Sequence, residues 1–136
     1  AIFGLNGNKN HAGNLIKAGF SLQDAIDKFD HDIHELVDRE FKIRLGAHTG
    51  KVIWGTIGIE GMEKEAAIGD TVNFASRIEQ ANKDLNTKFL ISESLYKQFD
   101  KWCTISGSYE IKAKGKEGTH KVFALDRMLA PMPVKK

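Results

Sequence analysis

The feature that most constrains the fold is a long run of apolar residues at helical spacing in the first third of the chain. Apolar side chains recur there every three or four residues, at Leu15, Ala18, Leu22, Ile26, Phe29, Ile33 and Leu36. This spacing places them on one stripe of an α-helix, and charged residues fill the opposite side. Glycines inside the run weaken a helix by up to about 1 kcal/mol each, but the stripe is long enough to tolerate them. The pattern predicts a helix from about residue 11 to residue 39.

The apolar period changes to two directly after this helix. Polar residues or glycine alternate there with Phe41, Ile43, Leu45 and Ala47. This alternation is typical of a strand with one polar face. The pair Thr49-Gly50 favours a turn, and an apolar run at 52–54 follows it. We therefore predict a hairpin between these two strands. Residues 55–65, rich in glycine and charge, are expected to be irregular.

The second half of the chain predicts a helix, a strand, a short helix and a second hairpin. Asp70 is a natural N-cap for a helix near 71–82, because its carboxylate can accept hydrogen bonds from the first helical turn. The elements predicted after it are a strand over 89–91, a helix over 93–100 capped by Ser92, and a hairpin of Tyr109–Lys114 with Thr119–Leu125. Residues 1–3 are expected to be the end of a buried strand. This order predicts an α+β fold, with the helices on one face of a mainly antiparallel sheet.

Composition excludes several classes of protein. The net charge of +2 is too balanced to indicate a nucleic-acid or membrane surface. The single Cys103 cannot form an internal disulfide, which suits a reducing compartment. No apolar run approaches the roughly 20 residues that span a bilayer. We expect one partial domain over 1–127, a disordered tail over 128–136, and a cytoplasmic location, with a membrane-anchored parent protein left open.

Polar residues that could carry chemistry are spread over several predicted elements. Asn73 and Arg77 are four residues apart, so they project from one side of their helix and could hold a sugar and a phosphate. Their ordinary interpretation is a solvated helix face. Arg44 on a strand and Lys114 near a hairpin tip are equally explained as surface charges, and His48 as a residue that supports the adjacent turn. The sequence contains no metal-ligand motif and no GxxxxGK[ST] phosphate-binding loop.

Three segments together resemble a known family. FKIRLGAHTGKVIWGTIG at 41–58 and AIGDTVNFASRIE at 67–79 resemble the catalytic core of class III adenylyl and guanylyl cyclases. AIFGL at 1–5 resembles the third strand of that domain, and IKAKGKEGTHKVFAL at 111–125 resembles its last hairpin. The resemblance implies a ferredoxin-like nucleotidyl cyclase fold that lacks the first strands and helices. It also implies a lyase that converts a nucleoside triphosphate to a 3′,5′-cyclic nucleotide in second-messenger signalling.

The resemblance also implies a role for each matched residue. Asn73 matches the asparagine that orients the substrate ribose, and Arg77 the arginine that stabilises charge on the α-phosphate. Lys114 matches the lysine that holds the β- and γ-phosphates. Arg44 matches a phosphate-binding arginine that the other subunit contributes. Members of the family work as head-to-tail dimers with active sites at the interface, which for identical chains gives two equivalent sites.

The chain departs from the family pattern in two respects. The metal-binding aspartates and the purine-selecting lysine of the family would lie before Ala1, so the two Mg²⁺ or Mn²⁺ ions of an intact domain would have no ligands in this chain. Ala66 occupies the base-selecting position, where adenylyl cyclases typically carry Asp or Thr and guanylyl cyclases Cys. We take ATP as the default substrate and GTP as the alternative. The chain alone is expected to have no significant cyclase activity.

Two alternatives remain at this point. A non-catalytic, cyclase-like module that binds nucleotides or regulates a partner would fit Ala66 and the missing metal ligands. A ferredoxin-like RNA-binding module would need aromatic side chains on an exposed sheet face. Phe41 alternates in phase with Ile43 and Leu45, so we expect it in the core instead.

Overall fold

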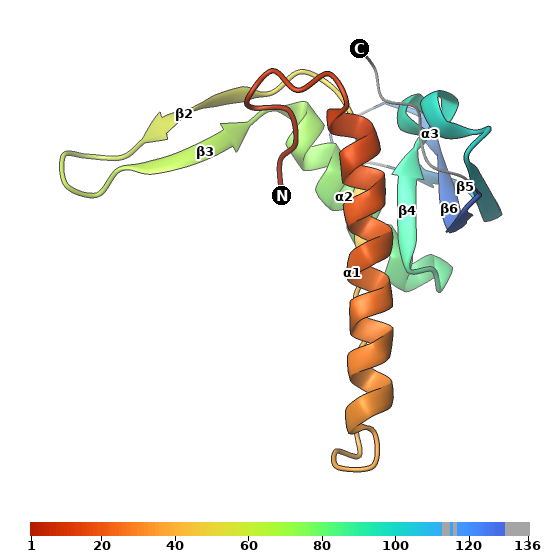
Figure 1. Ribbon diagram of the computed structural model, residues 1–136. Coiled ribbons are helices and arrows are strands. Elements are labelled where there is room, and N and C mark those ends of the chain that lie inside the picture. Colours follow the sequence, from red (N-terminus) through yellow and green to blue (C-terminus); the bar gives the residue numbers. More distant parts are fainter. Residues whose placement is uncertain (113–114, 116, 130–136) are drawn as a thin grey trace.

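The computed structural model describes residues 1–112, 115 and 117–129 of the chain. Its elements, in chain order, are α1 (His11–Ile33), β1 (Leu45–Ala47), β2 (Ile53–Ile57), β3 (Lys64–Ile68), α2 (Asp70–Leu85), β4 (Phe89–Ser92), α3 (Glu93–Phe99), β5 (Cys103–Lys112) and β6 (Thr119–Met128). Figure 1 shows a main sheet with helices packed against it and a long hairpin that projects from this body. The α+β class is as predicted.

The main sheet has the strand order β1-β4-β6-β5. β1 runs parallel to β4, whereas β4–β6 and β5–β6 are antiparallel pairs, so the sheet is mainly antiparallel as expected. All four residues of β4 are buried, because this short apolar strand lies inside the sheet with helices over both faces. The second predicted hairpin is confirmed as β5–β6, and β5 begins earlier than expected, at Cys103.

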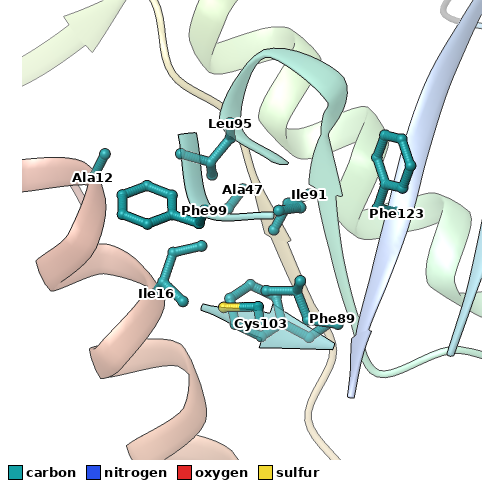
Figure 2. Close-up of a cluster of buried hydrophobic side chains, with 10 residues drawn as sticks. Ala12, Ile16, Ala47, Phe89, Ile91, Leu95, Phe99, Cys103 and Phe123 are labelled. Carbon is teal, nitrogen blue, oxygen red and sulfur yellow. The ribbon is translucent and has the colours of Figure 1, made fainter. Parts of the chain in front are cut away.

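The helices cover both faces of the sheet, not one face as predicted. One buried cluster joins Ala12 and Ile16 of α1 and Leu95 of α3 to Phe89 and Ile91 of β4 (Figure 2). The other cluster is formed by Phe74, Ile78, Leu90, Ile111, Val122 and Ala124, so that α2 covers the opposite face. Alternate residues of a strand point to opposite faces, which is why Leu90 and its neighbours divide between the two clusters. With both faces covered, the sheet offers no aromatic platform for RNA bases.

The helix α1 confirms the apolar stripe but ends at Ile33, six residues before the predicted end. Its second half extends beyond the main sheet (Figure 1), so the last residues of the stripe have no sheet to pack on. Leu36 is 82% exposed. The chain then reverses, and the backbone N–H of Phe41 donates to Asp30 Oδ1 at 2.7 Å. Phe41 is not a core residue: it is 36% exposed and packs edge-on against Phe29.

The strand predicted over residues 41–47 is reduced to the three residues of β1. The first half of that segment lies along α1 instead of along another strand. Residues 1–3 likewise form no strand, because no described strand offers them a backbone partner. Ala1, Ile2 and Phe3 instead line a cavity of about 510 Å³ between the start of α1 and the end of β1.

The first hairpin pairs differently from the prediction. β2 does not return along β1; it pairs with β3, in a separate two-stranded sheet with Gly55 opposite Ala66. The segment expected to be irregular therefore forms most of a hairpin. Its turn contains Gly58 and Gly61, both with positive φ, a backbone conformation that glycine adopts without steric cost. A period of two identifies a strand but does not identify its partner.

The helix α2 extends from Asp70 to Leu85 and covers more residues than predicted at both ends. Gly69, not Asp70, is the N-cap, and Asp70 is the first helical residue. The helix contacts the sheet most closely at Gly46, where a Cβ atom would overlap the backbone of Glu79. The side-chain amide of Asn82, fully buried, donates to Leu45 O at 2.9 Å and fixes the same contact.

The helix α3 and its cap follow the prediction. Ser92 precedes α3 and its side chain accepts a hydrogen bond from the backbone N–H of Leu95. Cys103 is buried beneath α3, in the cluster that Figure 2 shows. Burial raises the pKa of the Cys103 thiol to about 11, so the thiol stays protonated at neutral pH. The thiolate is the reactive form, and Cys103 therefore acts as an apolar core residue.

Replacement of Gly46 tests the contact between α2 and β1. Gly46→Ala should lower the free energy of unfolding by about 2 kcal/mol or more, because backbone atoms of Glu79 cannot move away as a flexible side chain could. Gly55→Ala is the matched control, since a Cβ there has no neighbour within 4 Å, and its effect should stay below about 1 kcal/mol. Urea denaturation measures both. Equal losses in the two variants would contradict this account.

Candidate functional site

The two polar residues that the sequence placed on one side of a helix lie on an exposed flank of α2. Phe74 and Ile78 of α2 face the core, and Ala81 and Leu85 pack beside them. This orientation turns Asn73 and Arg77, one helical turn apart, toward solvent on the same flank. The structure therefore brings these two side chains together as predicted.

Arg77 lies beside a groove between α2 and the end of β5. The groove has a volume of about 370 Å³, and its walls are formed by Arg77, Gln80, Ala81, Asp84, Leu85, Glu110, Ile111 and Lys112. Arg77 Nη1 donates to Gln80 Oε1 at 3.1 Å, which holds the guanidinium along the helix. Arg77 and Lys112 supply positive charge, and Asp84 and Glu110 supply negative charge. The groove can thus contact an anion from its basic side chains.

Lys114, the third predicted site residue, lies outside the described residues. It follows Lys112 by two positions, and Lys112 is both the last residue of β5 and part of the groove wall. The chain therefore enters the β5–β6 connection, which contains Lys114, from the side of the groove that faces Arg77.

Arg44 is not close to Arg77 within one chain. It is exposed and comes one residue before β1. β1 and β5 are the two edges of the four-stranded sheet. Three strand spacings separate these edges, which amounts to about 14 Å. The glycine contact with Glu79 also places β1 against the flank of α2 opposite Arg77. One molecule of the chain thus presents these two arginines at opposite sides.

Ala66 lies on β3, close to the N-terminal end of α2. It is half-buried and pairs with Gly55 of β2. Gly69, the N-cap of α2, follows three residues later. The residue that the sequence resemblance matched to the base-selecting position therefore comes shortly before the turn that carries Asn73. Its methyl group offers neither a hydrogen-bond donor nor an acceptor.

Contacts of the first turn of α2 are the part of the site that sequence reasoning missed. Gly69 gives the helix no side-chain cap, and Thr71 Oγ1 donates to Lys51 O at 2.7 Å. Phe74 lies between two imidazole rings, His48 at 4.9 Å and His120 at 5.0 Å between centroids. These contacts join segments distant in sequence, so no local pattern could have revealed them.

His48 serves the fold in a way that the sequence did not predict. Its Nδ1 atom lies 2.8 Å from Ser92 Oγ, the oxygen that caps α3. His48 therefore connects the end of β1 to the start of α3, and does not support the neighbouring turn through that nitrogen.

Metal-ion clusters and membrane-spanning helices are both lacking in the part of the chain that the structure describes. No three His, Cys, Asp or Glu side chains gather there in a way that could hold a metal ion. No helix in the same part of the chain is both long and apolar enough to cross a bilayer.

Comparison with known proteins agrees with this architecture. The family model described as the adenylate and guanylate cyclase catalytic domain matches residues 1–125. Adenylate cyclase 1 of Rhizobium meliloti (strain 1021) is 31% identical over 106 residues, which are 78% of this chain and 16% of that protein. The receptor-type guanylate cyclase Gyc76C of Drosophila melanogaster is 34% identical over 110 residues, covering 81% of this chain and 7% of that protein. The chain thus spans a small part of these relatives.

The fold is also similar to that of a solved cyclase structure. The crystal structure of the guanylyl cyclase Cya2 superimposes with a TM-score of 0.79 and 21% identity, covering 93% of this chain and 63% of that one. Because the family model matches nearly the whole chain and the fold is the same, the chain belongs to the adenylate and guanylate cyclase catalytic domain family.

Proposed function

We propose that this chain is the substrate-orienting part of a nucleotidyl cyclase, with ATP as the preferred substrate and GTP as the alternative. In this reaction the 3′-oxygen bonds to the α-phosphorus and the bond to the β-phosphate oxygen breaks. The hydroxyl proton is lost to a base or solvent, and pyrophosphate leaves. The observation that carries the proposal is the exposure of Asn73 and Arg77 on one flank of α2, with Arg77 in the wall of a groove that the end of β5 also lines.

Arg77 would act mainly on the transition state. Negative charge shifts to the α-phosphate oxygens and the leaving pyrophosphate as the ring closes, and a guanidinium aimed there gains strength as that charge develops. Asn73 would hold the ribose so that its 3′-oxygen lines up with the phosphorus, which lowers the entropic part of the barrier. Lys114 would bind the β- and γ-phosphates.

A second copy of the chain would complete the site. Arg44 is exposed at the β1 edge of the sheet, whereas the groove lies at the β5 edge, so Arg44 would approach the triphosphate from a partner. The β2–β3 hairpin offers a means of association: it projects from the body (Figure 1), and Ile53, Ile59 and Met62 are each more than 70% exposed. Such apolar exposure marks an interaction surface. We infer a head-to-tail homodimer in which each hairpin docks on the other molecule.

The choice between ATP and GTP would depend on the base-selecting position. Ala66 has no polar atom with which to discriminate the purine edges. Relatives of both kinds occur, an adenylate cyclase of Rhizobium meliloti and a guanylate cyclase of Drosophila melanogaster. Ala66 therefore favours loose selection, in which ATP and GTP both bind.

Divalent ions form part of the proposed reaction in an intact domain. Mg²⁺ or Mn²⁺, when bound, neutralises triphosphate charge and activates the attacking oxygen. Among the described residues, no three His, Cys, Asp or Glu side chains gather in a way that could hold such ions. A second candidate function is a cyclase-like module that binds nucleotides without turning them over, which the apolar side chain of Ala66 favours.

The isolated chain should have no significant cyclase activity. Incubation with Mn²⁺ and ATP or GTP, followed by chromatography of the products, is expected to show no cyclic nucleotide above a protein-free control. The reason is that no described set of side chains can hold the ions. Steady turnover that scales with protein concentration would overturn this expectation.

Removing the Arg77 guanidinium should weaken binding of a triphosphate. A charge-assisted hydrogen bond to phosphate contributes about 2 kcal/mol, so Arg77→Ala should raise the Kd for ATP by about tenfold or more. Arg127→Ala is the matched control, because Arg127 is also exposed but lies on β6, paired with Asp126. Calorimetry of the full chain gives both values. Equal effects would show that general surface charge, and not the flank of α2, attracts the nucleotide.

Charges on the β2–β3 hairpin should prevent dimerisation. Ile59→Lys combined with Met62→Lys places two cations where we expect contact with the partner, so sedimentation velocity should show a shift from dimer to monomer. Leu36→Lys serves as the control, because Leu36 is 82% exposed but lies beyond the end of α1. A dimer that survives the double substitution would exclude the hairpin as the interface.

A further inference from the structure

The first turn of α2 depends on one aromatic residue for its position. Phe74 directly follows Asn73 in the sequence and precedes Arg77 by three residues, and it is only 6% exposed. The N-cap Gly69 supplies no side-chain hydrogen bond, and only its carbonyl accepts from the amides of Val72 and Asn73. Packing of Phe74 therefore has a large part in fixing where Asn73 points.

The ring of Phe74 contacts two histidines that differ in their other bonds. His48 meets it edge-on at 89° and is also bound to Ser92 through Nδ1. His120 meets it at 65°. The Nε2 atom of His120 is buried and has no hydrogen-bond partner among the described residues. For His120 the ring contact with Phe74 is thus the interaction that the structure records.

The position of His120 on β6 explains how it reaches Phe74. His120 is the second residue of β6 and pairs with Ile111. Val122 and Ala124 of the same strand face α2, and alternation along the strand puts His120 on that face as well. The connection that contains Lys114 ends directly before β6. His120 therefore links the start of β6 to the helical turn that carries Asn73.

We propose that His120 is a positioning residue for the nucleotide site: through its ring contact with Phe74 it fixes the first turn of α2 and with it the direction in which Asn73 projects. This inference rests on the proposed function for its consequence in binding. His120 does not touch the substrate. Its imidazole acts on Phe74 through the ring contact, and its Nε2 atom makes no hydrogen bond among the described residues.

Three variants separate positioning from simple core filling. His120→Val removes the ring but keeps a residue that favours strands. His120→Phe keeps the aromatic contact and loses no recorded hydrogen bond at Nε2. Val122→Ala creates a small cavity under the same helix, two residues along the same face of β6. A role limited to core stability would make His120→Val and Val122→Ala behave alike.

Hydrogen exchange of the α2 amides tests the structural half of the inference. An aromatic pair contributes about 1 kcal/mol, so His120→Val should speed exchange at Asn73 and Phe74 about fivefold relative to amides near Leu85. His120→Phe should match the parent chain. Val122→Ala should change both ends of the helix by the same factor. Uniform acceleration in His120→Val, or failure of His120→Phe to restore the parent pattern, would overturn the proposal.

Titration of the same variants with ATP tests the functional half. His120→Val should weaken binding severalfold, whereas His120→Phe and Val122→Ala should bind as the parent chain does. If the parent chain bound no ATP while the exchange pattern held, the proposed function would fail and the positioning of the helical turn would stand. If ATP bound equally to all variants, the positioning role in binding would be wrong and the proposed function would be unaffected.

Discussion

The close contact between α2 and β1 determines which flank of α2 carries Asn73 and Arg77. Gly46 has no side chain, so the backbone of Glu79 rests directly on the strand. The buried amide of Asn82 then binds Leu45 O and prevents the helix from rolling about its axis. With the roll fixed, Phe74 and Ile78 must face the sheet, and the opposite flank is left for Asn73 and Arg77. The positions of these two exposed residues are thus set by buried contacts on the other side of the helix.

The same contact separates the two arginines of the candidate site. α2 spans the sheet, with one flank near β1 and the other near β5. Arg44 lies at the first edge and Arg77 at the second, so the two residues are at opposite sides of one molecule. A two-fold arrangement resolves this separation, because it brings the β1 side of one molecule to the β5 side of the next. The exposed β2–β3 hairpin is consistent with that arrangement, since apolar residues at its turn lack cover in the monomer.

Local patterns in the sequence were sufficient for the presence of the helices but not for all of the strands or for the pairing of the strands. The stripe from Leu15 to Ile33 identified α1, and the cap at Ser92 identified the start of α3, because both depend on neighbours within a few residues. The pairing of β2 with β3, and not with β1, is set by the tertiary structure and not by neighbouring residues in the sequence. The contact of His120 with Phe74 joins residues 46 positions apart, so no periodic pattern in the sequence indicates it. The flank of α2 could be predicted from helical spacing, whereas the separation of Arg44 from it required the strand order.

Exposure of Asn73 and Arg77 has a consequence for how such a site could work. In contact with water, a guanidinium and a phosphate attract each other by only about 1 kcal/mol, because solvent screens the charges. The attraction increases several-fold when the pair is covered and the local dielectric constant falls. A flank open to solvent in the single chain therefore cannot supply the stabilisation that cyclisation requires. A partner molecule would have to exclude water from Arg77 as well as supply Arg44, and the two effects would arise from the same act of assembly. Dimer formation and stabilisation of the transition state would then depend on the same interface. This dependence would explain why the proposed catalytic residues lie on an exposed flank of a helix and not in a closed pocket of one chain.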